Sequence, residues 1–318
     1  MNYSEDQHIK GKGEHGHTHG AIEPALLDSE RGIRTVKWSL VAMFVTALLQ
    51  VVVVAFTGSV ALLADTIHNF GDALTAIPLW IAFALSRRPP TRRYTYGYGR
   101  AEDLAGLAII LMILVSAIVA GYESIDRLLN PQEVRNLWAV ALAALIGLAG
   151  NEGVAYFRIR VGRQIGSAAL VADGYHAAVD GLTSLAVLIG AVGVWLGYPL
   201  ADPIVGLVIT VAILKILWDS AKPVFQRLLD GVDPEVMDEI DHTVTHIPEV
   251  RGINEVRVRW LGHRMHAELN IAVEPDLSVR QGHDIAIFVQ KELLRHLDYL
   301  SGATIHIDPL DSLGSEHH

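Results

Sequence analysis

Two segments of this sequence repeat one pattern of ionisable side chains. Residues 64–75 and residues 172–183 both follow A-D-x-x-H-x-x-x-D-x-L-T. The residues at the H and D positions of the two copies are His68, Asp72, His176 and Asp180. Residues four apart lie on the same face of a helix, so each histidine stacks over its aspartate if both segments are helical. Two imidazoles and two carboxylates that face one another can hold a tetrahedral metal ion such as Zn²⁺.

Both copies lie within strongly apolar stretches, where an ionisable side chain is unfavourable. At the centre of a membrane each one costs about 2.5–3.5 kcal/mol, so four of them require a function or a strong partner. The alternative is that each His–Asp couple only packs helices through hydrogen bonds, but its occurrence in two matching segments favours a metal site. Asp65 and Asp173, three residues before each histidine, are open to three interpretations: they orient the imidazoles, carry protons, or bond to another helix.

Six apolar stretches are long enough to cross a bilayer, which takes about 20 residues in a helix. We predict membrane spans at residues 36–57, 60–86, 101–125, 136–158, 168–196 and 200–220. The two copies of the motif fall in the second and the fifth span. Turn sequences such as Gly197-Tyr198-Pro199 separate the spans. With 51% hydrophobic residues and a mean hydropathy of +0.33, the chain is predicted to be an α-helical membrane protein.

The distribution of Lys and Arg predicts the orientation of the spans. Basic residues gather before the first span, after the second, between the fourth and fifth, and after the sixth, whereas the opposite loops hold only Arg127 and Arg135. Because cytoplasmic loops carry the excess of Lys and Arg, both termini are expected in the cytoplasm. Spans two and five then run in opposite directions, so the two three-helix halves are related by inversion, as in many transporters.

The last part of the chain has the pattern of a small α+β domain. Helices are expected over 234–246 and 276–296, and strands over 252–260, 266–273 and 303–307. This order is β-α-β-β-α-β-like with one strand short or missing. The expected parts of the chain are a disordered, histidine-containing cytoplasmic N-terminus (1–33), a six-helix transmembrane domain (34–222), a cytoplasmic α+β domain (223–310) and a disordered tail (311–318).

With these motifs the chain resembles the cation diffusion facilitator family of metal transporters, from the first span to the tail. The paired H-x-x-x-D, the six spans and the C-terminal domain carry the resemblance, and a His with an Asp on both helices resembles the zinc-type members. The resemblance implies that His68, Asp72, His176 and Asp180 form the transport site. It also implies a ferredoxin-like cytoplasmic domain and a homodimer that exchanges metal for protons by alternating access. Metal binding expels protons from imidazole and carboxylate, which gives such an exchange a physical basis.

The resemblance also points to a second metal site in the cytoplasmic domain. His283, His306 and Asp308 match positions that bind metal in relatives, and His306 and Asp308 alternate on a strand, so they face the same side. Two further family positions are Asn254 and Asn270 in this chain. The nearby His263 and His266 are candidates to replace them. The alternative is that all of these are ordinary surface histidines.

The loop after the second span lacks the histidines that form an additional metal site in some members of the family. Residues 92–102 carry Tyr94, Tyr96 and Tyr98 instead, before a G-x-G-R-A-E sequence. We therefore expect no metal site in this loop. Its Arg and Tyr content is typical of a segment that anchors a membrane protein at the bilayer surface.

The sequence predicts a divalent-metal efflux transporter rather than an enzyme. Zn²⁺ is the first expectation, with Co²⁺, Cd²⁺ and Ni²⁺ as alternatives, because imidazole and carboxylate suit all of them and the chain has no cysteine. The expected partners are a second copy of the chain, the bilayer of a bacterial inner membrane, metal ions and protons. Nucleic acid is not expected, given a net charge of −10.

Two other functions remain open. An uncoupled metal channel or sensor could use the same four side chains. An intramembrane zinc hydrolase needs an open coordination position, and the chain has no H-E-x-x-H motif. The tract His15-Gly16-His17-Thr18-His19 reads either as a weak metal-loading arm or as a dispensable tail.

Overall fold

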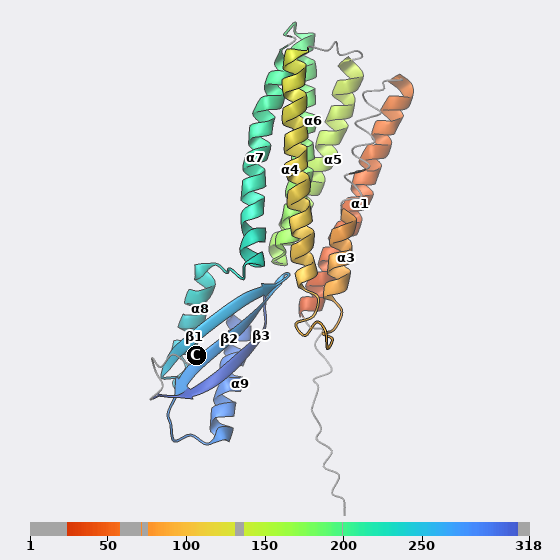
Figure 1. The fold of residues 1–318 in the computed structure, drawn as a ribbon. Helices are drawn as coiled ribbons and strands as arrows, with labels where there is room; N and C mark the ends of the chain where they lie inside the picture. Colours follow the sequence, from red (N-terminus) through yellow and green to blue (C-terminus); the bar gives the residue numbers. More distant parts are fainter. Residues whose placement is uncertain (1–23, 58–70, 72–75, 131–136, 199, 311–318) are drawn as a thin grey trace, which may run out of the picture.

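The structure, a computed structural model, describes residues 24–57, 71, 76–130, 137–198 and 200–310 (Figure 1). Five long apolar helices dominate it: α1 (Pro24–Thr57), α4 (Arg100–Leu129), α5 (Leu137–Gln164), α6 (Ala168–Trp195) and α7 (Ala201–Leu228). Their most apolar windows have mean hydropathies of 1.6 to 2.7, yet only 17% to 39% of each window is buried inside the protein. Apolar surface that the protein itself does not bury is expected to face lipid. The prediction of a helical membrane protein is thus confirmed.

The second predicted span is described only over its last part, α3 (Ala76–Ser86). Asp65, His68 and Asp72 lie outside the described residues, and so do the histidines of the N-terminal tract. The described part of this span packs against α1 and α4. The inverted relation of the two halves therefore stays a prediction.

The first helix begins earlier than expected, since residues 24–33 are helical and not part of a disordered N-terminus. The added turns extend beyond the apolar stretch to the C-terminal domain, where Asp28 forms an ion pair with Arg264. The fourth span likewise continues past residue 158 to Gln164. Both extensions contain polar residues, so a prediction from hydropathy ends the span before them. The helix continues through these residues because their side chains find partners.

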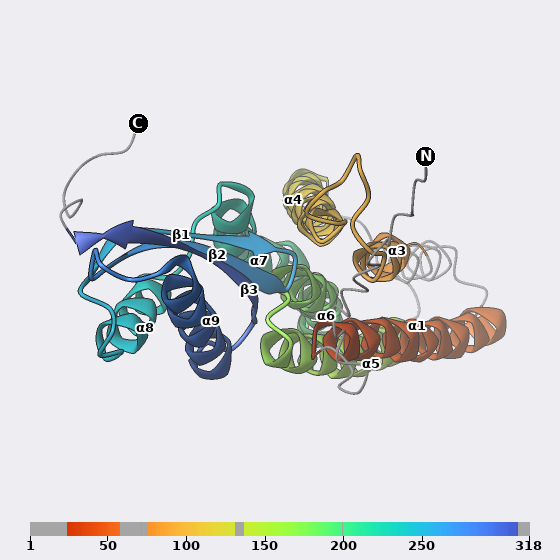
Figure 2. The same ribbon diagram turned by 90° about the horizontal axis from the view of Figure 1, so that it is seen from below.

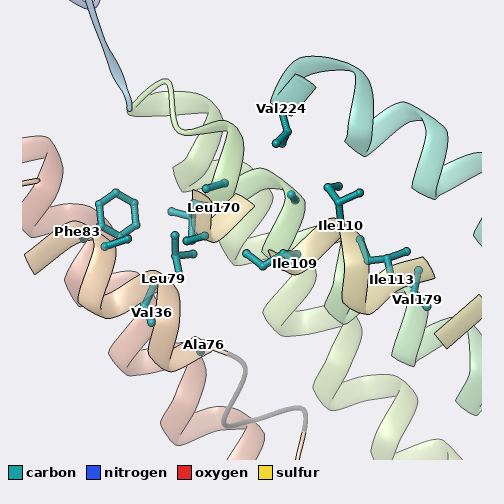
Figure 3. Packing of buried hydrophobic residues seen from close by; sticks show 14 of the residues in the cluster. Val36, Ala76, Leu79, Phe83, Ile109, Ile110, Ile113, Leu170, Val179 and Val224 are labelled. Carbon is teal, nitrogen blue, oxygen red and sulfur yellow. The ribbon is translucent and has the colours of Figure 1, made fainter. Parts of the chain in front are cut away.

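The helices enclose an apolar core at the end of the bundle that lies near the C-terminal domain. Figure 3 shows side chains from α1, α3, α4, α6 and α7 meeting there, among them Phe83, Ile109 and Leu170, which are all buried. Elsewhere α6 packs along α5, and α5 packs along α1. This packing fixes α6, the helix that carries the second copy of the motif, between α5, α4 and α7.

The C-terminal domain follows the predicted order of elements without a first strand. It consists of α8 (Pro234–Thr245), β1 (Gly252–Leu261), β2 (Arg264–Val273), α9 (Val279–His296) and β3 (Leu300–Pro309). The sheet order is β1-β2-β3, with β1 and β2 antiparallel and β2 and β3 parallel. The parallel connection runs through α9, which a Ser278–Gln281 capping box begins.

Helices α8 and α9 lie side by side on one face of this sheet (Figure 2). Alternate residues of β2, from Met265 to Ile271, are buried beneath them. The other face carries polar side chains, which the alternation of a strand places opposite the apolar ones. The prediction of a small α+β domain is confirmed.

Candidate metal centre

Helix α6 places the second His–Asp couple inside the bundle, on one helix face. His176 is 2% exposed and Asp180 is 4% exposed. His176 Nδ1 lies 4.0 Å from Asp180 Oδ1, the spacing expected for residues one turn apart. Ser167 begins the helix by accepting a hydrogen bond from the backbone N–H of Leu170. The couple is therefore buried where the sequence predicts half of the site; the other half, His68 and Asp72, is outside the described residues.

Asp173, one turn before His176, has a different partner. Its Oδ2 lies 3.1 Å from Arg158 Nη1 of α5, and both side chains are almost completely buried. The Arg158 guanidinium provides the counter-charge that a buried carboxylate needs. The tertiary structure thus selects the interhelical bond among the three interpretations of Asp173. Arg158, the last residue of the fourth predicted span, is buried inside the helical bundle.

Glycines bring α5 and α6 close together around this pair. A Cβ on Gly174 would lie 2.6 Å from Ile159 Cγ1 and 2.9 Å from the Ile159 backbone nitrogen. A Cβ on Gly162 would lie 2.9 Å from the Val171 backbone nitrogen. Small residues allow helix backbones in membranes to approach in this way. The position of His176 thus depends on glycines on both helices.

One ionisable side chain near the couple was missed by the sequence analysis. Glu152 lies inside α5, and its Oε1 is 2.8 Å from where a Cβ of Gly181 would be, one residue after Asp180. The signal that could have found it is a carboxylate in the middle of the fourth predicted span, since such residues are functional candidates by default.

A buried polar cluster joins the membrane helices to the C-terminal domain. His263, in the turn between β1 and β2, donates from Nδ1 to Glu102 Oε2 of α4 at 2.8 Å. The other carboxylate oxygen of Glu102 accepts a hydrogen bond from Ser167, the first-turn cap of α6. Ser29 Oγ of α1 lies 3.5 Å from His263 Nε2. The Glu102 carboxylate therefore connects α4 and α6 with the β1–β2 turn, and His263 adds a contact with α1.

The close approach at this junction also requires glycine. Gly262 adopts a φ of +69°, and a Cβ on it would lie 2.7 Å from the carbonyl oxygen of Gly99. Arg227, at the end of α7, donates to the carbonyl oxygens of Gly166 at 2.7 Å and Gly262 at 3.2 Å. Its guanidinium lies 3.8 Å from the centre of the Trp260 ring. The ends of α1, α4 and α7 thus contact the turn between β1 and β2.

The loop after α3 belongs to the same junction. The Arg259 guanidinium lies 5.3 Å from the Tyr96 ring, and the His266 ring is 6.2 Å away from it. Tyr96 therefore contacts the sheet of the C-terminal domain, and the role of the loop as an anchor at the bilayer surface stays a prediction. Cation–π attraction between Arg259 and the Tyr96 ring contributes to this contact.

The five candidate ligands of the C-terminal domain do not meet in one protomer. His306 Nε2 lies 3.0 Å from Asp308 Oδ1, and Asn254 donates to Asp308 Oδ2 at 2.9 Å. His266 is opposite Gly302 in the register, four residues or about 13 Å along the sheet from His306. His283 is exposed at the start of α9, and His263 is in the junction. Among the described residues, no three His, Asp or Glu side chains are placed to hold a metal ion together.

Two known family profiles together match nearly the whole chain. Residues 36–229 match the profile described as "Cation efflux transmembrane domain". Residues 232–310 match the profile described as "Cation efflux protein, cytoplasmic domain". The boundary between the two profiles falls between α7 and α8.

Individual relatives cover the same length. A probable cation efflux system protein of Mycobacterium tuberculosis is 55% identical over 93% of this chain and 90% of its own. The manganese efflux system protein MneP of Bacillus subtilis is 27% identical over 88% of this chain and 98% of its own. Among solved structures, a single-residue variant of MamM-CTD matches 24% of this chain and 95% of its own, with 25% identity and a TM-score of 0.23.

Proposed function

Because this chain belongs to the cation efflux family, a family of metal-ion transporters and not of enzymes, we propose that it carries Zn²⁺ out of the cytoplasm in exchange for protons. The observation that carries the proposal is the buried couple of His176 and Asp180 on α6. The same couple recurs in the sequence as His68 and Asp72. Four such ligands complete a tetrahedral shell for zinc.

The donor set supports zinc over manganese. MneP, named for manganese, is a relative at 27% identity, so the manganese ion is the second candidate. Manganese prefers carboxylate, carbonyl and water oxygens, whereas imidazole suits zinc, cobalt and nickel. Two histidines among four ligands therefore favour zinc, with Co²⁺, Cd²⁺ and Ni²⁺ as the other cargoes.

Proton exchange follows from what the ligands require. His176 must be neutral and Asp180 ionised to bind a cation, so binding releases protons and protonation releases metal. Asp173 does not take part, because the Arg158 guanidinium keeps its carboxylate paired. The excess of Lys and Arg in the loops favours a cytoplasmic location of both termini, and metal is then loaded from the cytoplasmic side.

We expect the protein to work as a homodimer through its cytoplasmic domain. The pair of His306 and Asp308 lies on the sheet face that α8 and α9 leave open, and it supplies two ligands. A complete site there, with His266, His283 or His263 as in the sequence prediction, needs a second copy or a rearrangement. Light scattering of the purified protein should give the mass of two chains.

The transport site is tested by metal uptake into proteoliposomes. Zinc uptake should fall at least tenfold in His176→Ala and in Asp180→Ala, because each loses a ligand. Asp219→Asn, which removes an exposed carboxylate paired with Lys215 on α7, should transport normally. Parallel uptake of cobalt, nickel, cadmium and manganese ranks the cargoes. Normal zinc uptake by both site variants would make the repeated motif structural and would remove the proposed site.

The proton coupling needs its own measurement. The lumen of inside-out vesicles corresponds to the exterior of the cell. Zinc uptake into such vesicles should require an acidic lumen, and protons should appear in the surrounding medium as zinc enters. An ionophore that collapses the pH gradient should stop accumulation. Zinc flux that follows its own gradient regardless of pH would identify the uncoupled channel instead.

A further inference from the structure

A groove between α8 and α9 gathers metal-binding side chains that belong to neither site discussed above. It has a volume of about 340 Å³, and its lining includes the apolar residues Ile247 and Phe288. The side chains with ligand atoms that line it are Glu239, His242, His246, Glu292 and His296. Helices α8 and α9, whose side chains line the groove, cover one face of the sheet (Figure 2). His306 and Asp308 lie on the other face, because they alternate along β3 with Ile305 and Ile307, which pack into the core.

Helix α8 presents two of these histidines as a chelating pair. His242 and His246 are four residues apart on one helix face, and their ring centres are 4.3 Å apart. Histidines with this spacing on a helix can bind one metal ion together. Helix α9 repeats the spacing with Glu292 and His296.

The hydrogen bonds of the rings leave the metal-binding nitrogen available. His246 Nδ1 lies 2.6 Å from the backbone oxygen of His242, and His296 Nδ1 lies 2.9 Å from that of Glu292. A carbonyl oxygen only accepts, so both Nδ1 atoms carry the hydrogen, and the neutral rings have their lone pair on Nε2. A ring nitrogen bonded to a backbone carbonyl in this way is the usual arrangement behind a metal-binding histidine.

We propose that this groove is a second metal site, which binds one zinc-class divalent ion between α8 and α9. His242 and His246 provide two ligands from one helix, and His296 with a carboxylate of Glu292 or Glu239 completes a four-coordinate shell. Imidazoles in the absence of any cysteine select zinc, cobalt or nickel over magnesium or calcium. The site does not depend on the transport mechanism proposed above.

Binding requires the side chains to close on the ion. As they stand, no three ligands in the described part of the chain converge, and Glu292 also lies 3.7 Å from Arg295 Nη1. The His296 side chain is 47% exposed and that of Arg295 is 76% exposed, so both can turn without disturbing the core. The ion would add a direct link between two helices that pack against each other, and would make the domain more rigid.

Zinc binding by the full-length protein tests the proposal. The background carries Asp180→Ala and His306→Ala, which remove ligands from the proposed transport site and from the sheet pair. We expect equilibrium dialysis to show a difference of one zinc ion per chain between two proteins. The background protein should bind one ion more than the same protein with His242→Gln and His246→Gln added. His296→Gln alone should weaken binding at this site at least tenfold. The N-terminal histidines are present in every variant and cancel in the difference.

A matched control and a second readout complete the experiment. Asp241→Asn with Asp284→Asn removes one carboxylate from each helix outside the groove and should leave zinc binding unchanged. In the background protein, zinc should also slow hydrogen exchange in both α8 and α9, and it should not do so in the groove variants. The same zinc content with and without the groove histidines overturns the proposal, and so does normal binding by His296→Gln, because the site would then not join the helices.

Discussion

At the scale of single residues, two carboxylates on one helix have opposite roles. Asp180 shares its helix face with His176, whereas Asp173 is paired with Arg158 of the neighbouring helix. Burying an ion pair is costly, but removing one partner costs more because the other charge is left without compensation. Asp173 is therefore a structural residue, and Asp180 is a candidate ligand.

This difference predicts the effect of removing the Asp173 charge. Asp173→Asn should lower the free energy of unfolding by roughly 3–5 kcal/mol, because the Arg158 guanidinium remains buried without a counter-charge. Unfolding in detergent, followed by tryptophan fluorescence, measures the change. The double variant Arg158→Met with Asp173→Leu should recover most of the loss. Wild-type stability of Asp173→Asn alone would show that the pair is not formed in the folded protein.

At the scale of elements, the contact between α5 and α6 sets the position of the candidate site. Gly174 faces the Ile159 backbone across this contact, and Gly162 faces Val171. Helix α6 begins at Ser167, directly after the turn that leaves α5, so the two helices are antiparallel neighbours. A shift of α6 would displace His176 and Asp180 together.

Two glycines of this helix pair should respond in opposite ways to alanine. Gly174→Ala should destabilise the protein and lower zinc uptake, because its methyl group would overlap the Ile159 backbone nitrogen. Gly153→Ala on α5 meets nothing within 4 Å among the described residues and should stabilise the helix by about 0.5–1 kcal/mol. Thermal unfolding and uptake measured side by side provide the comparison. If both changes had the same effect on stability and zinc uptake, the flexibility of the glycine backbone, and not the close packing of α5 against α6, would determine these two properties.

At the scale of the whole molecule, the turn between β1 and β2 connects the two domains. Glu102 bonds to His263 of this turn and to Ser167 at the start of α6. The helix that carries the candidate ligands is therefore linked to the cytoplasmic domain by two hydrogen bonds that share the Glu102 carboxylate. Arg100 adds an ion pair to Asp230, just after α7.

The junction predicts a specific loss when its histidine is removed. His263→Leu should destabilise the protein by about 1–3 kcal/mol, because it leaves a buried oxygen of Glu102 without its donor. Hydrogen exchange should become faster at the β1–β2 turn and at the start of α6. His266→Leu, three residues further along the chain in β2, removes a 3.5 Å contact with Thr304 and the edge-on ring contact with Tyr96 but no contact with Glu102, and it serves as the control. Unchanged exchange at both segments in His263→Leu would contradict the connection.

Much of the architecture follows from local patterns in the sequence. Runs of apolar residues predict the long helices, and alternation predicts β1, β2 and β3 within a few residues of their bounds. The spacing of His176 and Asp180 places both on one helix face because the helix has a fixed period. These properties depend on neighbours along the chain, and so they can be read without knowing the fold.

The tertiary structure alone decided which distant residues meet. Arg158, at the predicted end of the fourth span, is buried beside Asp173. His263 was a candidate metal ligand and forms a hydrogen bond with Glu102, far away in the sequence. The groove histidines His242 and His296 come from helices separated by two strands. A buried charge is unfavourable unless it is paired, but the periodicity of the sequence does not show which helix supplies the partner. Local residue patterns thus determined the elements and the family, and packing determined what each ionisable side chain does.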